Sequence, residues 1–161
     1  GVMSFLNMPH MIIPFEDNYE FIGLSYEESD SLLNSDYFIT LKDGAWNIID
    51  YNDATLTANI TEPIVAFNGD AIILENISNE NILVDYNNNE KLSMSYKKLT
   101  FTGKYLNCTT HDDTFYVYDL MNNKIISDTF SLSGKDGSTI LDEKSLKVYI
   151  GNSLRQTIKL S

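Results

Sequence analysis

The sequence predicts a mainly β protein, α+β by strict count, in which successive antiparallel hairpins form a sandwich or a rolled sheet. Short apolar runs are separated by turn residues, β-branched and aromatic residues dominate those runs, and only one segment carries a helix signature. The chain has 161 residues, of which 43% are hydrophobic, enough for one domain with a sizeable core. We expect an extended N-terminal arm over residues 1–15 and a single β-rich domain over residues 16–161.

Hairpins are predicted where a Gly- or Asn-containing turn lies between two apolar runs. Asp43-Gly44 separates Tyr37–Leu41 from Trp46–Asp50, and both turn residues tolerate positive φ. Similar turn signals lie between Ile64–Phe67 and Ala71–Leu74, between Ile82–Val84 and Leu92–Tyr96, and between Leu146–Ile150 and Leu154–Leu160. Such closely spaced strands are typical of antiparallel β domains.

The stretch Phe115–Ile126 reads as a further hairpin, with Met121–Lys124 at its tip. It loosely resembles three other hairpins, which could indicate the repeated blades of a propeller. The hairpins begin at irregular intervals, however, and no signature dipeptide recurs. The sequence therefore favours successive hairpins in one β domain over a propeller.

One short helix is expected near residues 26–35. Ser25 and Glu28 have the spacing of a capping box, in which each side chain accepts the other residue's backbone N–H. Acidic residues in the first turn suit the positive end of the helix dipole, and Asn34 is a plausible left-handed stop.

The net charge of −12 is unevenly distributed. Up to Glu90 the chain has 16 acidic residues and one basic residue, Lys42, whereas the remainder has 10 basic and 7 acidic residues. An acidic surface repels nucleic acid and anionic membranes, and no apolar run approaches the roughly 18 residues of a membrane span. The acidic half is either a solvated face or a patch for a basic partner.

No pattern of residues indicates catalysis, a metal site or a cofactor. His10 and His111 are the only histidines, and Cys108 is the only cysteine, so zinc spacing is absent from the sequence. His111-Asp112-Asp113 reads as a solvated turn, and Cys108 as a small buried hydrophobic residue. A carboxylate pair for glycoside hydrolysis stays open, because 23 acidic residues offer many pairs. We predict a non-enzymatic protein.

Aromatic residues are the best candidates for ligand binding. Strand alternation places Tyr116 and Tyr118 on one face of their strand and Phe115 and Val117 on the other. The more apolar pair should face the core, which leaves the tyrosines outward, although a second packed face is the competing interpretation. The predicted ligand-binding residues are Tyr116, Tyr118, Trp46 and Tyr86.

Two segments carry a resemblance to a known family: Trp46–Asp50, and the region from Gly103-Lys104-Tyr105 to Phe115–Tyr118. In size and style the chain resembles the globular head of a rotavirus outer-capsid spike, the distal fragment released by proteolysis. The better-known heads are galectin-like sandwiches that bind glycans. This chain differs in its acidic capped helix and in having Arg155 as its only arginine, so another sheet arrangement is also allowed.

The resemblance implies a recognition module at the virion surface that attaches to a host cell-surface glycan or protein receptor. It also implies that the remainder of a larger spike polypeptide is a partner. The alternative is a structural or interaction domain whose acidic N-terminal half docks a basic protein partner. Salt dependence separates the two, because charge-driven contacts weaken with salt.

Overall fold

The structure, a computed structural model, describes residues 2–3, 11–13, 21–25, 37–50, 57 and 60–160. The described strands are all antiparallel and form five sheets. The predicted β-rich fold built of hairpins is therefore confirmed. The predicted helix at 26–35 lies outside the described residues, and Ser25 is the last residue of a strand. The N-terminal arm stays a prediction, and two short strands in it pair with each other: β1 (Val2–Met3) and β2 (Met11–Ile13).

Four larger sheets follow one another along the chain. The first sheet contains β3 (Phe21–Ser25), β4 (Tyr37–Lys42) and β5 (Ala45–Asp50). The second contains β6 (Ile64–Phe67), β7 (Ile72–Glu75) and β8 (Asn81–Val84). The third contains β9 (Lys98–Thr102), β10 (Tyr105–Thr109), β11 (Thr114–Asp119), β12 (Lys124–Ile125) and β13 (Phe130–Ser131). The fourth contains β14 (Gly137–Leu141), β15 (Ser145–Ile150) and β16 (Ser153–Lys159).

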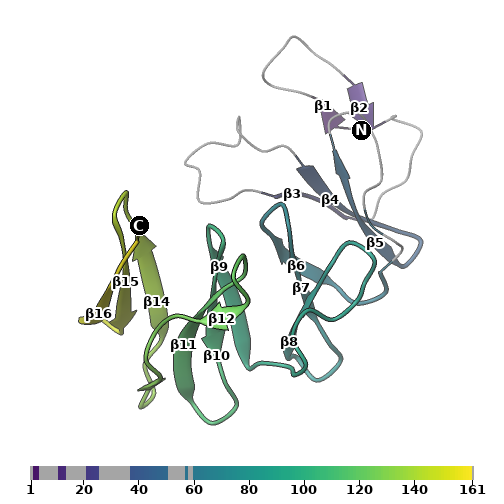
Figure 1. The fold of residues 1–161 in the computed structure, drawn as a ribbon. Helices are drawn as coiled ribbons and strands as arrows, with labels where there is room; N and C mark the ends of the chain where they lie inside the picture. Colours follow the sequence, from purple (N-terminus) through teal and green to yellow (C-terminus); the bar gives the residue numbers. More distant parts are fainter. Residues whose placement is uncertain are drawn as a thin grey trace.

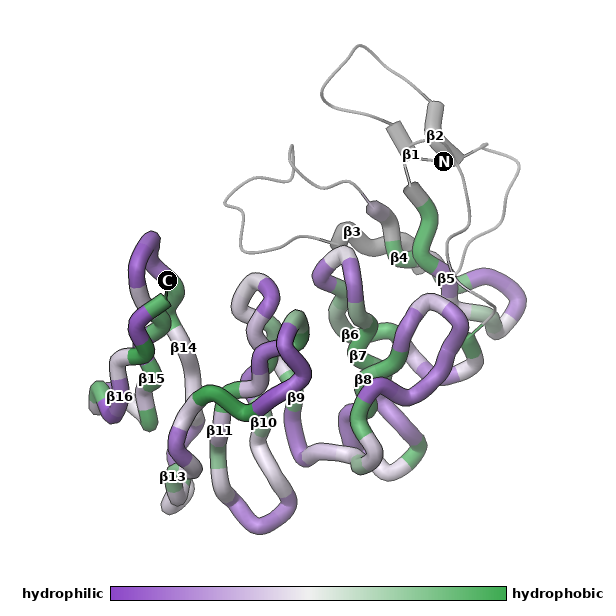
Figure 2. Tube along the Cα trace, viewed as in Figure 1, coloured by the Kyte–Doolittle hydropathy of each residue, from purple (hydrophilic) through white to green (hydrophobic). Residues whose placement is uncertain are grey.

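The four sheets are stacked face to face in chain order, as Figure 1 shows. A separate hydrophobic cluster fills each gap between neighbouring sheets. Figure 2 shows the hydrophobic residues gathered in these strands and the hydrophilic residues in the turns. This stacking of antiparallel meanders is how neighbouring blades pack in a β-propeller. The choice of successive hairpins in one β domain over a propeller stays a prediction.

Two-sided burial explains the apolar sequences of the inner sheets. In β7, Ile72 and Leu74 face the first cluster, whereas Ile73 faces the second, and all three are at most 2% exposed. In β11, Phe115 and Val117 face the third cluster and are 0% exposed, as predicted. A sheet covered on both faces needs continuous apolar strands rather than simple alternation of apolar and polar residues.

Turn residues of the first two predicted hairpins behave as the sequence predicts. The predicted strand Leu92–Tyr96 is wrong, because residues 90–96 join β8 only through isolated bridges at Glu90 and Tyr96. Asp43 and Gly44 have φ values of 50° and 76°, which joins β4 directly to β5. Positive φ at both central positions matches the right-handed twist of the paired strands. Asn68 closes the next hairpin differently, because its side-chain Oδ1 accepts the backbone N–H groups of Asp70 and Ala71.

Hydrogen bonds also join the sheets to one another along two rims. The upper rim, at the upper ends of the strands of the second to fourth sheets in Figure 1, contains the turns at residues 68–70, 103–104, 120–123 and 142–144. There the Asn68 side-chain amide donates to the Gly103 carbonyl over 3.2 Å. The lower rim contains the turns at residues 76–80, 110–113, 133–136 and 151–152. There His111 Nε2, in the turn between β10 and β11, lies 2.8 Å from Glu80 Oε2, in the turn between β7 and β8.

A buried polar network lies between the third and fourth sheets. Asn107 Nδ2 donates to the hydroxyls of Thr100 and Thr102 over 3.1 and 3.0 Å. The Thr139 hydroxyl of β14 lies 2.9 Å from Asn107 Oδ1 and 2.7 Å from the Thr102 hydroxyl. Buried polar groups of this kind must be satisfied together, so the network fixes how these two sheets meet.

The third cluster leaves no space beside Gly137. An ideal Cβ at this position would lie 2.2 Å from Cδ2 of the buried Phe115 ring. We expect Gly137→Ala to lower the free energy of unfolding by about 2 kcal/mol, because the ring and the sheet must move apart. Urea denaturation measures the loss, with the exposed neighbour Ser138→Ala as control, for which a change within about 0.5 kcal/mol is expected. Equal stability of the two variants would contradict this packing.

Candidate functional site

Tyr116 and Tyr118 lie on the face of the third sheet that packs against the second sheet. Both are half-buried beside the second hydrophobic cluster. Their side chains are therefore neither fully exposed nor fully buried. The competing interpretation of a second packed face accounts for their partial burial, and their remaining exposure leaves the predicted role in binding open.

The Tyr116 ring is fixed by Tyr96. The two rings meet edge to face, with centroids 6.2 Å apart and an interplanar angle of 72°. Their hydroxyl oxygens lie 2.5 Å apart. Burial raises the pKa of both phenols, and the shared hydrogen bond raises the pKa of Tyr116 further. Both phenols are therefore protonated at neutral pH and can donate hydrogen bonds, but neither can act as a base.

Tyr118 has an exposed apolar neighbour. In the register between β11 and β12, Tyr118 lies opposite Ile125, whose side chain is 51% exposed. The Asp119 carboxylate positions this returning strand, because it accepts the backbone N–H of Met121 over 3.0 Å and the Asn122 amide over 2.7 Å. The tyrosine strip is defined here as a set of residues along this margin of the second and third sheets. It contains the buried Tyr96 and four partly or largely exposed residues, Leu92, Tyr116, Tyr118 and Ile125.

Trp46 and Tyr86 belong to a different gap. Both are half-buried beside the first hydrophobic cluster, between the first and second sheets. The Trp46 backbone forms a bridge with Ile60, through hydrogen bonds of 2.7 and 3.1 Å. The Tyr86 ring packs edge to face on Phe67, with centroids 5.7 Å apart, and its hydroxyl donates to the Gly69 carbonyl. The four predicted residues therefore divide into two pairs, and the structure does not bring them into one site.

The lower rim holds a cluster that the sequence analysis missed. His111 Nε2 lies 2.8 Å from Glu80 Oε2 and 3.5 Å from Ser95 Oγ. These residues are far apart in the chain and come from turns without periodic signals, so no sequence pattern could have grouped them. Nearby, the Asp113 carboxylate lies 3.9 Å from Lys97 Nζ and accepts the Gly134 N–H over 3.3 Å.

The geometry of Glu80, His111 and Ser95 does not activate the serine. In a catalytic triad the carboxylate and the hydroxyl contact different nitrogens of the imidazole. Here both contact Nε2, so the imidazole cannot accept the serine proton while the carboxylate orients it from the other side. The cluster can bind polar groups at the rim, but in this arrangement it supplies no nucleophile.

Cys108 is a buried hydrophobic residue, as predicted. Its side chain is 0% exposed in the second cluster, and burial raises the pKa of its thiol to about 12. A thiol that keeps its proton is a poor nucleophile. Among the described residues, no group of three or more His, Cys, Asp and Glu side chains is placed to hold a metal ion. No helix among them has the length and apolarity to cross a membrane.

Comparisons with known proteins give partial likenesses only. No family model matches the sequence, and no curated protein matches it significantly. The designed protein Ika8 is 10% identical over 86% of this chain and 45% of its own, with a TM-score of 0.47. A fragment of HIRA is 14% identical over 84% of this chain and 52% of its own, with a TM-score of 0.49. The WD40 β-propeller domain of Doa1 is 12% identical over 85% of this chain and 52% of its own, with a TM-score of 0.35. The chain thus spans about half the length of these structures.

The raised thiol pKa predicts how stability depends on pH. The folded state holds the Cys108 proton more tightly than the unfolded chain, whose thiol has a pKa near 9.0. This contribution is fully present below pH 9.0 and is lost as pH rises toward about 12. We expect the difference in urea midpoint between the wild type and Cys108→Ala to shrink across that range. A constant difference would mean that the thiol is not protected from solvent.

Proposed function

We propose that this chain is a non-enzymatic recognition module that binds a cell-surface glycan or protein at the tyrosine strip. The observation that carries the proposal is the pairing of half-buried Tyr118 with the exposed Ile125 on one margin of two packed sheets. Apolar and phenolic groups side by side suit a ligand with both apolar and hydroxyl surfaces.

The strip is prepared for binding by the packing beneath it. Tyr116 and Tyr96 are held by their ring contact and by their hydroxyl pair, so they lose little side-chain freedom when a ligand arrives. Ile125 and Tyr118 are held by the β11–β12 ladder. A surface that is already ordered retains more of its contact energy as affinity.

Two groups of the described residues that could act as nucleophiles are not activated. Cys108 is buried and protonated at neutral pH, and the Ser95 hydroxyl is not activated by His111. Attachment to a host receptor at the virion surface, as part of a larger spike polypeptide, rests on the resemblance of the sequence to rotavirus spike heads.

Charge supports a second candidate, an interaction domain whose acidic half docks a basic protein. The chain carries a net charge of −12, and most of its acidic residues precede Lys91. A contact of this kind weakens steeply with added salt, whereas a contact through the tyrosine strip changes little.

The test of the tyrosine strip uses Tyr118→Ala combined with Ile125→Ser. Tyr118 is preferred to Tyr116, because replacing Tyr116 also removes the hydroxyl pair with Tyr96. Binding of the labelled protein to a glycan array and to intact cultured cells is measured, with glycosidase and protease treatment of the cells to separate glycan from protein receptors. We expect affinity to fall about fivefold to tenfold, since each stacked ring contributes about 1 kcal/mol.

The matched control is Phe130→Ala, which removes a half-buried aromatic ring beside the third cluster, on β13. This control should bind as the wild type does. Unchanged binding of the double variant, with its melting temperature intact, would place the recognition surface elsewhere. Binding that disappears between 50 and about 300 mM salt would favour the acidic interaction domain instead.

A further inference from the structure

The outer edge of each sheet is defined here as the free side of β5, β8, β11 or β16. The outer edge of the fourth sheet differs from the outer edges of the other three. In the first sheet, Ile60 pairs with Trp46 on the free side of β5. In the second, Glu90 and Tyr96 pair with β8, and in the third, β12 and β13 pair with β11. Among the described residues, β16 has a partner on one side only, which is β15. Every second residue of β16 therefore directs its backbone N–H and C=O away from the sheet.

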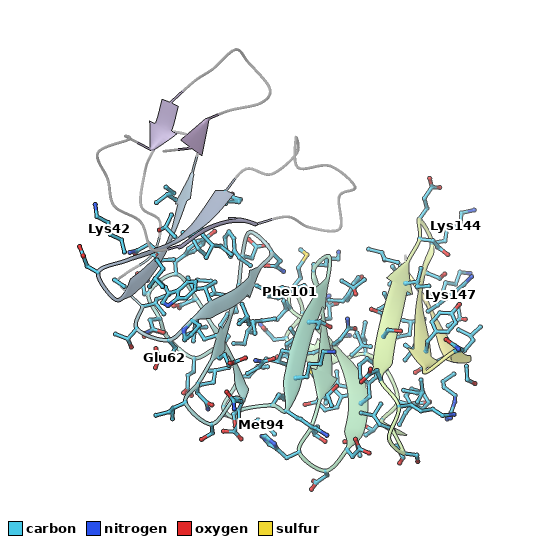
Figure 3. The ribbon with its side chains drawn as sticks, turned by 180° about the vertical axis from the view of Figure 1, so that it is seen from behind. Lys42, Glu62, Met94, Phe101, Lys144 and Lys147 are labelled. Carbon is cyan, nitrogen blue, oxygen red and sulfur yellow. The ribbon has the colours of Figure 1, made fainter. Side chains whose placement is uncertain are left out.

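The outer face of the fourth sheet is also uncovered by other described strands. Leu146, Val148 and Ile150 face the third cluster, so the alternate residues of β15 point the other way. Figure 3 shows the Lys147 side chain directed away from the neighbouring sheet. The register places these residues on the same outer face: Ser138, Ile140, Ser145, Lys147, Tyr149, Leu154, Thr157 and Lys159.

This face combines exposed apolar groups with cations. Ile140 and Leu154 are 56% and 49% exposed. Lys147 and Lys159 lie on the same face, and Arg155 occupies the β-bulge between Leu154 and Gln156. No carboxylate stands among the residues that the register assigns to this face. Asp142, in the turn between β14 and β15, has a pKa lowered by hydrogen bonds within its turn and also by the nearby Lys147 cation, so the cations nearest the β16 edge are Arg155 and Lys159.

We propose that β16 and the outer face of the fourth sheet accept an extended, acidic segment of a partner protein. The segment adds an antiparallel strand to the free edge of β16, as other peptides extend sheet edges. Its backbone pairs with the outward N–H and C=O groups of β16. Its carboxylates meet Lys159 on the outer face and Arg155 at the bulge, and its alternate apolar side chains lie on the opposite face, next to Ile158.

The charges select this occupant over a second copy of the chain. Pairing two β16 edges would bring Arg155 and Lys159 of each copy close to those of the other, and like charges across a strand pair are destabilising. An acidic strand turns the same cations into attractive contacts.

The experiment uses the whole chain and labelled eight-residue peptides that alternate valine with glutamate or with lysine. Fluorescence anisotropy measures binding, and amide hydrogen exchange locates it. We expect the glutamate peptide to bind, to slow exchange at the amides of β16, and to weaken with rising salt. The lysine peptide should bind at least tenfold more weakly. Equal binding of the two peptides, or protection at another sheet, would overturn the proposal.

Arg155→Glu combined with Lys159→Glu should weaken binding of the glutamate peptide at least tenfold, with the melting temperature unchanged. Lys124→Glu, at an exposed position of β12, is the matched control and should bind as the wild type does. Tyr118→Ala should also leave this binding unchanged, which separates the proposal from the function assigned to the tyrosine strip. Salt-sensitive self-association without peptide that disappears in the double variant would make a second copy the occupant instead.

Discussion

Burial of the inner sheets on both faces is the constraint on which the rest of the structure depends. β7 supplies Ile72 and Leu74 to one hydrophobic cluster and Ile73 to the next, so each strand serves two cores at once. A substitution in such a strand affects the packing of two gaps. The surfaces that remain free for function are therefore the rims, the outer margins of the gaps, and the uncovered face of the fourth sheet.

The contacts between sheets show how separate sheets are held together although the inner ones are buried on both faces. Apolar clusters hold the sheets together, while a small number of polar contacts fix their relative positions. Asn107 contacts Thr139 across one gap, and Asn68 contacts Gly103 across another. Hydrophobic packing is non-directional, whereas hydrogen bonds between buried groups are costly to misplace. The polar contacts thus give specificity to a stack that apolar burial stabilises.

The sequence predicted the hairpins better than their arrangement. Asp43-Gly44 between two apolar runs fixes a hairpin locally, because both residues adopt positive φ. Which faces pack together depends on contacts between distant segments, such as Phe115 with Gly137, and no local pattern encodes these. The same dependence on contacts between distant segments explains why the sequence predicted only part of the candidate site. Alternation correctly separated Tyr116 from Phe115, but the partner of Tyr116, Tyr96, comes from another sheet, and so does the Glu80 that contacts His111.

The two surfaces proposed for binding differ in what their packing permits. The tyrosine strip is the margin of a filled gap, so its rings are held in place and can recognise a ligand with little rearrangement. The fourth sheet offers an edge whose backbone groups lack a strand partner among the described residues, together with a face of exposed side chains. Main-chain pairing supplies affinity there with little regard to sequence, so specificity must come from Arg155, Lys159 and their apolar neighbours. One surface therefore suits the shape of a ligand, and the other suits the charge pattern of an extended chain.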